Sequence, residues 1–210
     1  MAIRAGIGGP MARTKDPALE AARRQQVVEA VIALLSDSSW RTLTLDRVAE
    51  RAGVSKGVVS YWFAGKDALV LAAVQTYHQQ AAQRYVGIVM DSEATAHERL
   101  VRLVHAAFPS QAEVEREVRF QLEVLSYAKD KPAVAAEVRG AYEAFRLACE
   151  ALLQIGVAEG YVDADNADGL YRYIHAIIDG LSIHAAFDPD VDMAALRQRL
   201  VALLERWFRG

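Results

Sequence analysis

The chain has 210 residues, of which 53% are hydrophobic, 24% are charged and only 5 are proline, and its formal net charge is -3. This composition indicates a globular, helix-rich protein and excludes a disordered chain. The single cysteine, Cys149, excludes an intramolecular disulfide and favours a reducing cytoplasm, and no apolar run approaches the roughly 18 residues of a membrane span.

The charge is distributed unevenly along the chain. Residues 1–70 contain 10 Lys and Arg against 7 Asp and Glu, whereas residues 71–210 contain 14 against 20. Only the N-terminal part therefore carries the net positive charge that attracts a polyanion such as DNA.

The first elements in chain order are a flexible segment and a helix. Residues 1–15 are expected to be flexible, because the stretch Met1–Pro10 is rich in glycine and a second methionine follows at position 11. A helix is predicted from Pro17, which suits the first helical position, and the stretch SDSSW ends it.

Two short helices separated by a glycine come next. Thr44 is a predicted N-cap, and one face of the helix after it is apolar, with Leu45, Val48, Ala49 and Ala52. Gly53 permits a tight turn, and Ser55 is a predicted second N-cap. This spacing is typical of a helix-turn-helix, although corners of two helices that bind no DNA have the same spacing.

The second short helix has two different faces. Its inner face is predicted to be apolar, with Val54, Val58, Val59, Trp62 and Phe63. Its outer face is small, polar and cationic, with Lys56, Gly57, Ser60 and Tyr61. Such a face suits the major groove of DNA, because a lysine can reach a guanine edge or a phosphate and a glycine allows close approach. An ordinary solvated face is the alternative.

Longer helices are predicted for the rest of the chain, at about 66–90, 94–108, 111–130, 132–159, 166–187 and 191–208. No useful strand pattern occurs, so the predicted fold is all-α. It comprises a helix-turn-helix domain at residues 16–65 and a larger helical domain at residues 66–210. We predict no catalytic residues, no cofactor and no metal site, because His105, His175 and His184 lack ligand spacing.

The stretch TLTLDRVAERAGVSKGVVSYWFAGKDAL, with RRQQVVEAVIALL before it, resembles the DNA-binding domain of the TetR family of bacterial repressors. RRQQ, GVVSYWF and IIDGLSIHAAF are most similar to BetI-type members, which respond to choline. The resemblance implies a transcriptional regulator that contacts a double-stranded DNA operator. The predicted DNA-binding residues are Thr44, Ser55, Lys56, Gly57, Ser60, Tyr61, Trp62 and Lys66.

The resemblance also implies that the larger domain forms a homodimer and binds a small-molecule inducer. The dimer seam would consist of the helices at 166–187 and 191–208, with Ile178 near its middle. The candidate pocket residues are His105, Phe108, Tyr127, Tyr142, Phe145, Cys149, Tyr171 and His175. An apolar or amphipathic inducer is expected ahead of a quaternary ammonium, because the interior should be rich in aliphatic residues.

Two other classes of protein remain open at this point. One is a helical enzyme or small-molecule carrier whose N-terminal corner binds no DNA. The other is a dimeric interaction module without a ligand pocket. Salt-dependent binding to DNA separates a regulator from both.

Overall fold

The computed structural model of the chain describes residues 17–209, and the segment 1–15 lies outside this range. Every regular element within it is helical, as predicted. The elements are α1 (Pro17–Asp37), the 3-10 helix η1 (Trp40–Thr42), α2 (Leu45–Ala52), α3 (Lys56–Trp62), α4 (Lys66–Val89), α5 (Ala96–Ala107), α6 (Gln111–Ala128), α7 (Pro132–Ala158), α8 (Ala164–Ala167), α9 (Leu170–Phe187) and α10 (Met193–Arg209).

One predicted helix is divided in the structure. The single helix expected at 166–187 is wrong, because α8 and α9 are separated at Asp168 and Gly169. Gly169 has a φ of 69°, a left-handed conformation that glycine adopts without strain, and Asp168 is extended. The side chain of Asp163 caps α8 by accepting a hydrogen bond from the backbone N–H of Asp165.

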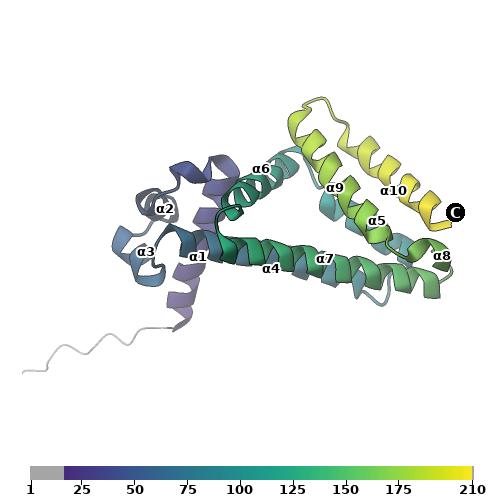
Figure 1. Ribbon diagram of the computed structural model, residues 1–210, viewed down its shortest axis with the longest axis horizontal. Coiled ribbons are helices and arrows are strands. Elements are labelled where there is room, and N and C mark those ends of the chain that lie inside the picture. The colour runs from purple at the N-terminus through teal and green to yellow at the C-terminus, as the bar shows by residue number, and fades with distance from the viewer. Residues whose placement is uncertain (1–16, 210) are drawn as a thin grey trace, which may run out of the picture.

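The long helices α4 and α7 run side by side along the long axis of the molecule (Figure 1). Helices α1, α2 and α3 form a compact group at one end, and α9 and α10 lie toward the other (Figure 1). Helix α6 packs against both α1 and α9. Helix α6 therefore links the N-terminal group of helices to α9.

The buried residues form two clusters. The first contains the inner faces of α1 to α4, and it extends into the second half of α6 with Phe120, Val124 and Tyr127. The second contains side chains of α5 and of α6 to α10. The N-terminal helices therefore share their core with α6, and this shared core fixes the position of α6 relative to the helix-turn-helix.

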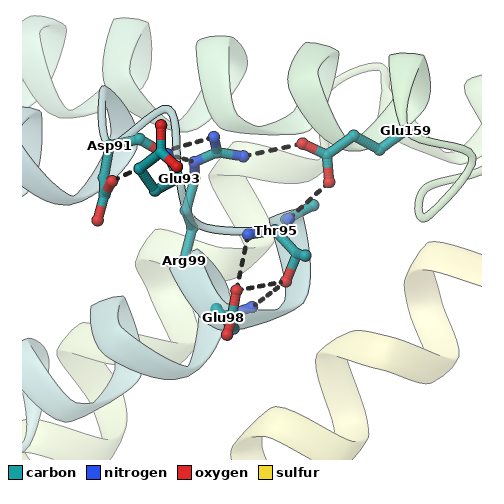
Figure 2. Close-up of polar contacts among 7 residues, drawn as sticks. Asp91, Glu93, Thr95, Glu98, Arg99 and Glu159 are labelled. Carbon is teal, nitrogen blue, oxygen red and sulfur yellow. Dashed lines mark hydrogen bonds and ion pairs between the residues drawn. The ribbon is translucent and has the colours of Figure 1, made fainter.

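A buried arginine ties together the ends of α4, α5 and α7 (Figure 2). The guanidinium of Arg99, only 5% exposed, donates two hydrogen bonds to the backbone carbonyl of Asp91, at 3.2 and 2.7 Å. It also lies 2.9 Å from the carboxylate of Glu159, which accepts a hydrogen bond from the backbone N–H of Ala96. The hydrogen bond from Ala96 and then the one from Arg99 lower the pKa of Glu159.

Among the described residues, no single helix is long and apolar enough to cross a membrane. Only α3 and α4 taken as a pair, with a 73° bend between them, reach that length and composition.

Candidate DNA-binding surface and ligand cavity

The helix-turn-helix is built from three local features. The hydroxyl of Thr44 caps α2 by accepting from the backbone N–H of Arg47 at 3.3 Å, and that of Ser55 caps α3 by accepting from Val58 at 3.3 Å. Gly53 ends α2 in a left-handed conformation with a φ of 64°. The two predicted N-caps and the predicted glycine turn are therefore confirmed.

Helix α3 has the two predicted faces. Val59 and Phe63 are buried, and Trp62 is half-buried against the same core. The opposite face is exposed to solvent and contains Ser55, Lys56, Gly57, Ser60 and Tyr61. Thr44, at the start of α2, is exposed as well. This face has the exposure and polarity that a recognition helix presents to the major groove.

Two residues of the exposed face bear on how closely α3 can approach DNA. A Cβ atom added to Gly57 would meet only the hydroxyl of Ser55, at 3.7 Å, so packing within the chain does not require a glycine there. The ammonium of Lys56 lies 2.9 Å from the carboxylate of Asp46, and both side chains are well exposed. Such an exposed pair is weak and readily exchanged for another anion.

Lys66 lies at the start of α4, with its ammonium 4.9 Å from the ring centroid of Trp40. Partial burial lowers the pKa of this lysine, and the neighbouring Asp67 opposes that shift. The expected contact between Lys66 and a phosphate stays a prediction, and it would draw the ammonium away from Trp40.

Helix α6 is hydrogen-bonded to the N-terminal helices at two places. The carboxylate of Glu123 accepts from the backbone N–H of Trp40 at 2.7 Å and from the hydroxyl of Ser39 at 3.1 Å. Asp67 accepts from the hydroxyl of Tyr127 and, at 2.7 Å, from the ammonium of Lys131. We call the six residues of these contacts the latch: Ser39, Trp40, Asp67, Glu123, Tyr127 and Lys131.

A cavity of about 560 Å³ lies among α4, α6, α7 and α9. Five aromatic residues from three of these helices line it, namely Tyr77, Tyr85, Phe120, Tyr142 and Phe145. Three carboxylates line it as well, from Glu117, Glu137 and Asp179, against one arginine, Arg84. The volume is that of a pocket for a small organic molecule.

The carboxylates of the cavity have no close partner of opposite charge among the described residues. Glu117 lies 3.8 Å from Arg84, Glu137 lies 3.8 Å from His78, and Asp179 lies 3.6 Å from His175. These distances exceed the 2.7–2.9 Å of a charge-assisted hydrogen bond. Burial raises the pKa of Glu117 and of Asp179, because desolvation disfavours the ionised form. A bound cation would supply the missing counter-charge.

A polar atom of His78 also lacks a partner. Its Nδ1 is buried without a hydrogen bond to any described residue, and burial lowers the pKa of this histidine. Buried polar atoms normally have hydrogen-bond partners, so an unpaired one beside a cavity is consistent with a ligand site.

The structure places the candidate pocket residues in several environments. Tyr142, Phe145 and His175 line the 560 Å³ cavity, and Cys149 lines a smaller adjoining cavity together with Phe145. Four others line neither of these cavities. Phe108 and Tyr127 are buried in the two cores, His105 is exposed, and Tyr171 is half-buried beside two arginines, Arg146 and Arg172.

Sequence reasoning missed the contribution of α4 to the cavity, and on α6 it named Tyr127 where Glu117 and Phe120 line the cavity. Tyr77, Ala81 and Tyr85 recur every four residues on α4 and line it together. That spacing was a usable signal, since side chains four residues apart share one face of a helix. Glu117 carried no such signal, because a glutamate on an amphipathic helix usually faces solvent.

Two family patterns match the chain. Residues 27–73 match the family described as bacterial regulatory proteins, tetR family, and residues 96–209 match the family described as BetI-type transcriptional repressor, C-terminal. The second match alone covers more than half of the chain. The first includes α2, the turn and α3, and the second includes most of the elements that line the cavity.

Individual proteins are similar to this chain over different lengths. The regulator BetI of Brucella suis is 25% identical over 183 residues, which cover 87% of this chain and 89% of BetI. The regulator BetI 1 of Chromohalobacter salexigens is 40% identical over 53 residues, which cover 25% of this chain and 26% of that protein.

A solved structure of a proposed transcriptional regulator from Saccharomonospora viridis, in complex with choline, is also similar. It has a TM-score of 0.77 and 25% sequence identity, and the match covers 88% of this chain and 96% of that one. Because the helix-turn-helix, the cavity and both family patterns agree, this chain belongs to the TetR family of bacterial transcriptional regulators, with a C-terminal domain of the BetI type.

Proposed function

We propose that this protein is a cytoplasmic repressor that binds a palindromic operator as a homodimer and is released by a small-molecule inducer. The observation that carries the proposal concerns α6. This helix lines the cavity through Glu117 and Phe120, and it hydrogen-bonds to the N-terminal helices through Glu123. A ligand that moves α6 therefore also acts on the helix-turn-helix. The proposal assigns no chemical reaction to the cavity.

The exposed face of α3 supports DNA binding through the major groove. Lys56 and Tyr61 can reach base edges or phosphates, and the flat surface at Gly57 allows the helix to approach closely. One such helix reads only a few base pairs. Two copies about 34 Å apart, in successive major grooves of a palindrome, multiply the discrimination.

A stripe along α9 supports dimerisation. Tyr173, Ala176, Gly180, Ile183 and Phe187 follow one another at intervals of three and four residues, so they share one face of the helix. Tyr173 is 65% and Phe187 is 73% exposed, and a Cβ atom added to Gly180 would meet nothing within 4 Å. An exposed apolar stripe with a small residue in its middle suits a second copy of the same helix.

Ile178 does not belong to this stripe. It lines both the 560 Å³ cavity and the smaller adjoining one, so its side chain points into the subunit. This inward position counts against the expectation that Ile178 lies near the middle of the seam, since one side of α9 lines the cavities and another side is exposed. Ile183, on the outward face, is the residue that would meet a partner.

The lining of the cavity supports an organic cation as the inducer. Aromatic faces attract cations, and the partly desolvated carboxylates of Glu117 and Asp179 lack close counter-charges. The similar regulator from Saccharomonospora viridis binds choline. The lining therefore favours a cation, whereas the sequence favoured an apolar or amphipathic inducer. An amphipathic inducer remains compatible with this lining.

Release from DNA would follow from a shift between two arrangements of the dimer. The operator binds the arrangement in which the two α3 helices fit successive grooves, and the inducer binds the other arrangement more tightly. Each ligand must then weaken the binding of the other by the same factor.

The test uses the full chain and DNA from upstream of its own gene, with binding followed by fluorescence anisotropy. We expect an affinity that falls steeply with salt, because each phosphate contact releases a counterion. Choline should weaken operator binding, and its neutral carbon isostere, dimethylbutanol, should do so much less. Absence of salt-dependent binding would favour the carrier, enzyme or interaction-module alternatives.

A pair of variants tests the cation site within the same experiment. Glu117→Gln should keep operator affinity and lose most of the response to choline. Glu115→Gln is the matched control, because Glu115 lies on the same helix and does not line the cavity. An equal response in both variants would remove Glu117 from the proposed ligand site.

A further inference from the structure

A second, smaller cavity adjoins the one described above. Its volume is about 60 Å³, and it lies among α4, α5, α7, α9 and α10. Four residues line both cavities: Tyr85, Phe145, Ala148 and Ile178. We call the larger cavity the head chamber and the smaller one the tail chamber. These shared walls place the two chambers side by side, so a molecule that passes between these side chains would occupy both.

The two chambers differ in chemistry. The head chamber contains Glu117, Glu137 and Asp179, whereas none of the described residues that line the tail chamber carries a charged side chain. The tail chamber is lined mainly by aliphatic and aromatic side chains, among them Val104, Leu152, Leu204 and Phe208. The thiol of Cys149 stays neutral there, since burial raises its pKa to about 12. A chamber of this kind accepts an apolar group and offers a hydroxyl no adequate partner.

We propose that the two chambers together select an amphipathic organic cation, with an ammonium head in the head chamber and a short alkyl tail in the tail chamber. This inference rests on the proposed function, since it assumes the cation site there. It goes further, because it predicts that a cation with a short alkyl tail binds more tightly than choline. Choline has a head of the right charge, but its short arm ends in a hydroxyl.

The volume of the tail chamber limits the length of the tail. About 60 Å³ accommodates roughly four water-sized groups. A tail of about four carbons therefore fills it, and each methylene placed in an apolar site contributes about a fourfold gain in affinity. Longer tails gain little more, because further carbons find no room in a chamber of this volume.

Two residues line the tail chamber alone and can change its volume in opposite directions. Ala107, on α5, is buried, and Ala107→Leu would fill the chamber. Leu152, on α7, is half-buried, and Leu152→Ala would enlarge it. Neither residue lines the head chamber, so neither substitution removes a contact to the ammonium group.

The experiment is calorimetric titration of the full chain with tetramethylammonium and with alkyltrimethylammonium ions from ethyl to hexyl. Wild-type protein should gain about fourfold in affinity per methylene up to about butyl, and then no more. Ala107→Leu should bind all members about equally, and Leu152→Ala should extend the gain to longer tails. Thermal unfolding of each variant checks that it folds. The outcome for Leu152→Ala stands even where Ala107→Leu is unstable.

The possible failures are distinguishable. If tetramethylammonium itself does not bind to wild-type protein, the cation site of the proposed function is wrong and this inference falls with it. If tetramethylammonium binds and the affinity does not change with tail length, only the inference about the tail chamber is overturned. The inference about the tail chamber is also overturned if affinity depends on tail length to the same extent in wild-type protein and in both variants.

Discussion

The contribution of a charged residue to stability depends on its exposure, as two residues at opposite ends of the molecule illustrate. Lys56 and Asp46 form an exposed pair on the outer side of the helix-turn-helix, where water solvates both partners. Arg99 is buried, and it has a carboxylate and a backbone carbonyl as partners. The first pair can be exchanged for DNA at small cost, whereas the second contributes to the stability of the fold.

Replacing Lys56 tests direct readout of bases. Lys56→Ala should weaken operator binding by about 1–3 kcal/mol and random-DNA binding much less, because a contact to a base edge depends on sequence. Lys66→Ala should weaken binding to both DNAs alike, since a contact to a phosphate does not depend on the base sequence. Anisotropy titrations with the two DNAs measure both variants. A loss for Lys56→Ala that is equal on operator and random DNA would exclude its base contact.

Replacing Arg99 tests the buried contacts shown in Figure 2. Arg99→Met should lower the free energy of unfolding by about 1–3 kcal/mol, because the carbonyl of Asp91 loses two hydrogen bonds and the three helix ends lose their link. Urea denaturation followed by circular dichroism measures this loss. The hydrogen bond from Ala96 and then the one from Arg99 lower the pKa of Glu159, so the stabilisation that this carboxylate contributes is present at neutral pH and is lost as the pH falls through that lowered pKa.

Arg102→Met is the matched control for this change. Arg102 lies three residues further along α5 and is paired with the side chain of Asp91, but it is well exposed. Its loss should change stability much less than the loss of Arg99. Equal effects of the two substitutions would mean that burial does not decide how much these arginines contribute to the free energy of unfolding.

At the scale of elements, α6 is the helix on which ligand binding and DNA binding meet. Glu117 and Phe120, near its middle, line the head chamber, and Glu123 and Tyr127, nearer its C-terminal end, belong to the latch. The two sets of residues lie within a few turns of one rigid helix. Under the proposed function, a displacement at the cavity would therefore reach Trp40 and Asp67 without any intermediate element.

Replacing Glu123 tests this connection. Glu123→Ala removes the acceptor for Ser39 and Trp40, so the response of the operator complex to a cationic inducer should shrink well below the usual coupling of about 5–150-fold. Calorimetry should show inducer affinity for the free protein close to that of wild type. Leu122→Ala, at an exposed position beside it, should leave the coupling intact. An unchanged coupling in Glu123→Ala would show that the latch is not the connection.

At the scale of the whole molecule, the arrangement of the two cores does not follow the division at residues 65 and 66. The first core joins α1 to α4 with the second half of α6 and the start of α7. The predicted division at residues 65 and 66 therefore does not coincide with a boundary between two packed units. The exposed stripe of α9 faces away from both cores.

Replacing Ile183 tests the dimer. Ile183→Asp should produce monomers, because a partner helix would bury an unpaired carboxylate at a cost of several kcal/mol. It should also lose operator binding, since a single α3 helix reads too few base pairs. Light scattering measures the mass, and circular dichroism checks the fold. Leu147→Asp places the same charge at an exposed apolar position on α7 and should stay dimeric. A dimeric Ile183→Asp would place the seam elsewhere.

The helix-turn-helix could be predicted almost completely from the sequence, and the cavity could not. Thr44, Gly53 and Ser55 act on backbone groups within four residues, so their roles are legible in the local pattern. The cavity draws on four helices, and aromatic residues at helical spacing occur equally in cores and in pockets. Tyr142 and Tyr127 look alike in the sequence, but the first lines the cavity and the second is buried beside Trp40.

The sequence by itself determined the all-α fold, the turn at Gly53 and the two faces of α3, because helix periodicity, capping and the conformational freedom of glycine act over a few residues. Only the tertiary structure decided which face of α9 lines the cavities, where the carboxylates of the head chamber gather and how α6 reaches the helix-turn-helix. Those features depend on contacts between residues 60 and 83 positions apart, as between Asp67 and Tyr127 or Trp40 and Glu123. Such pairs share no local pattern, since packing of whole helices brings them together.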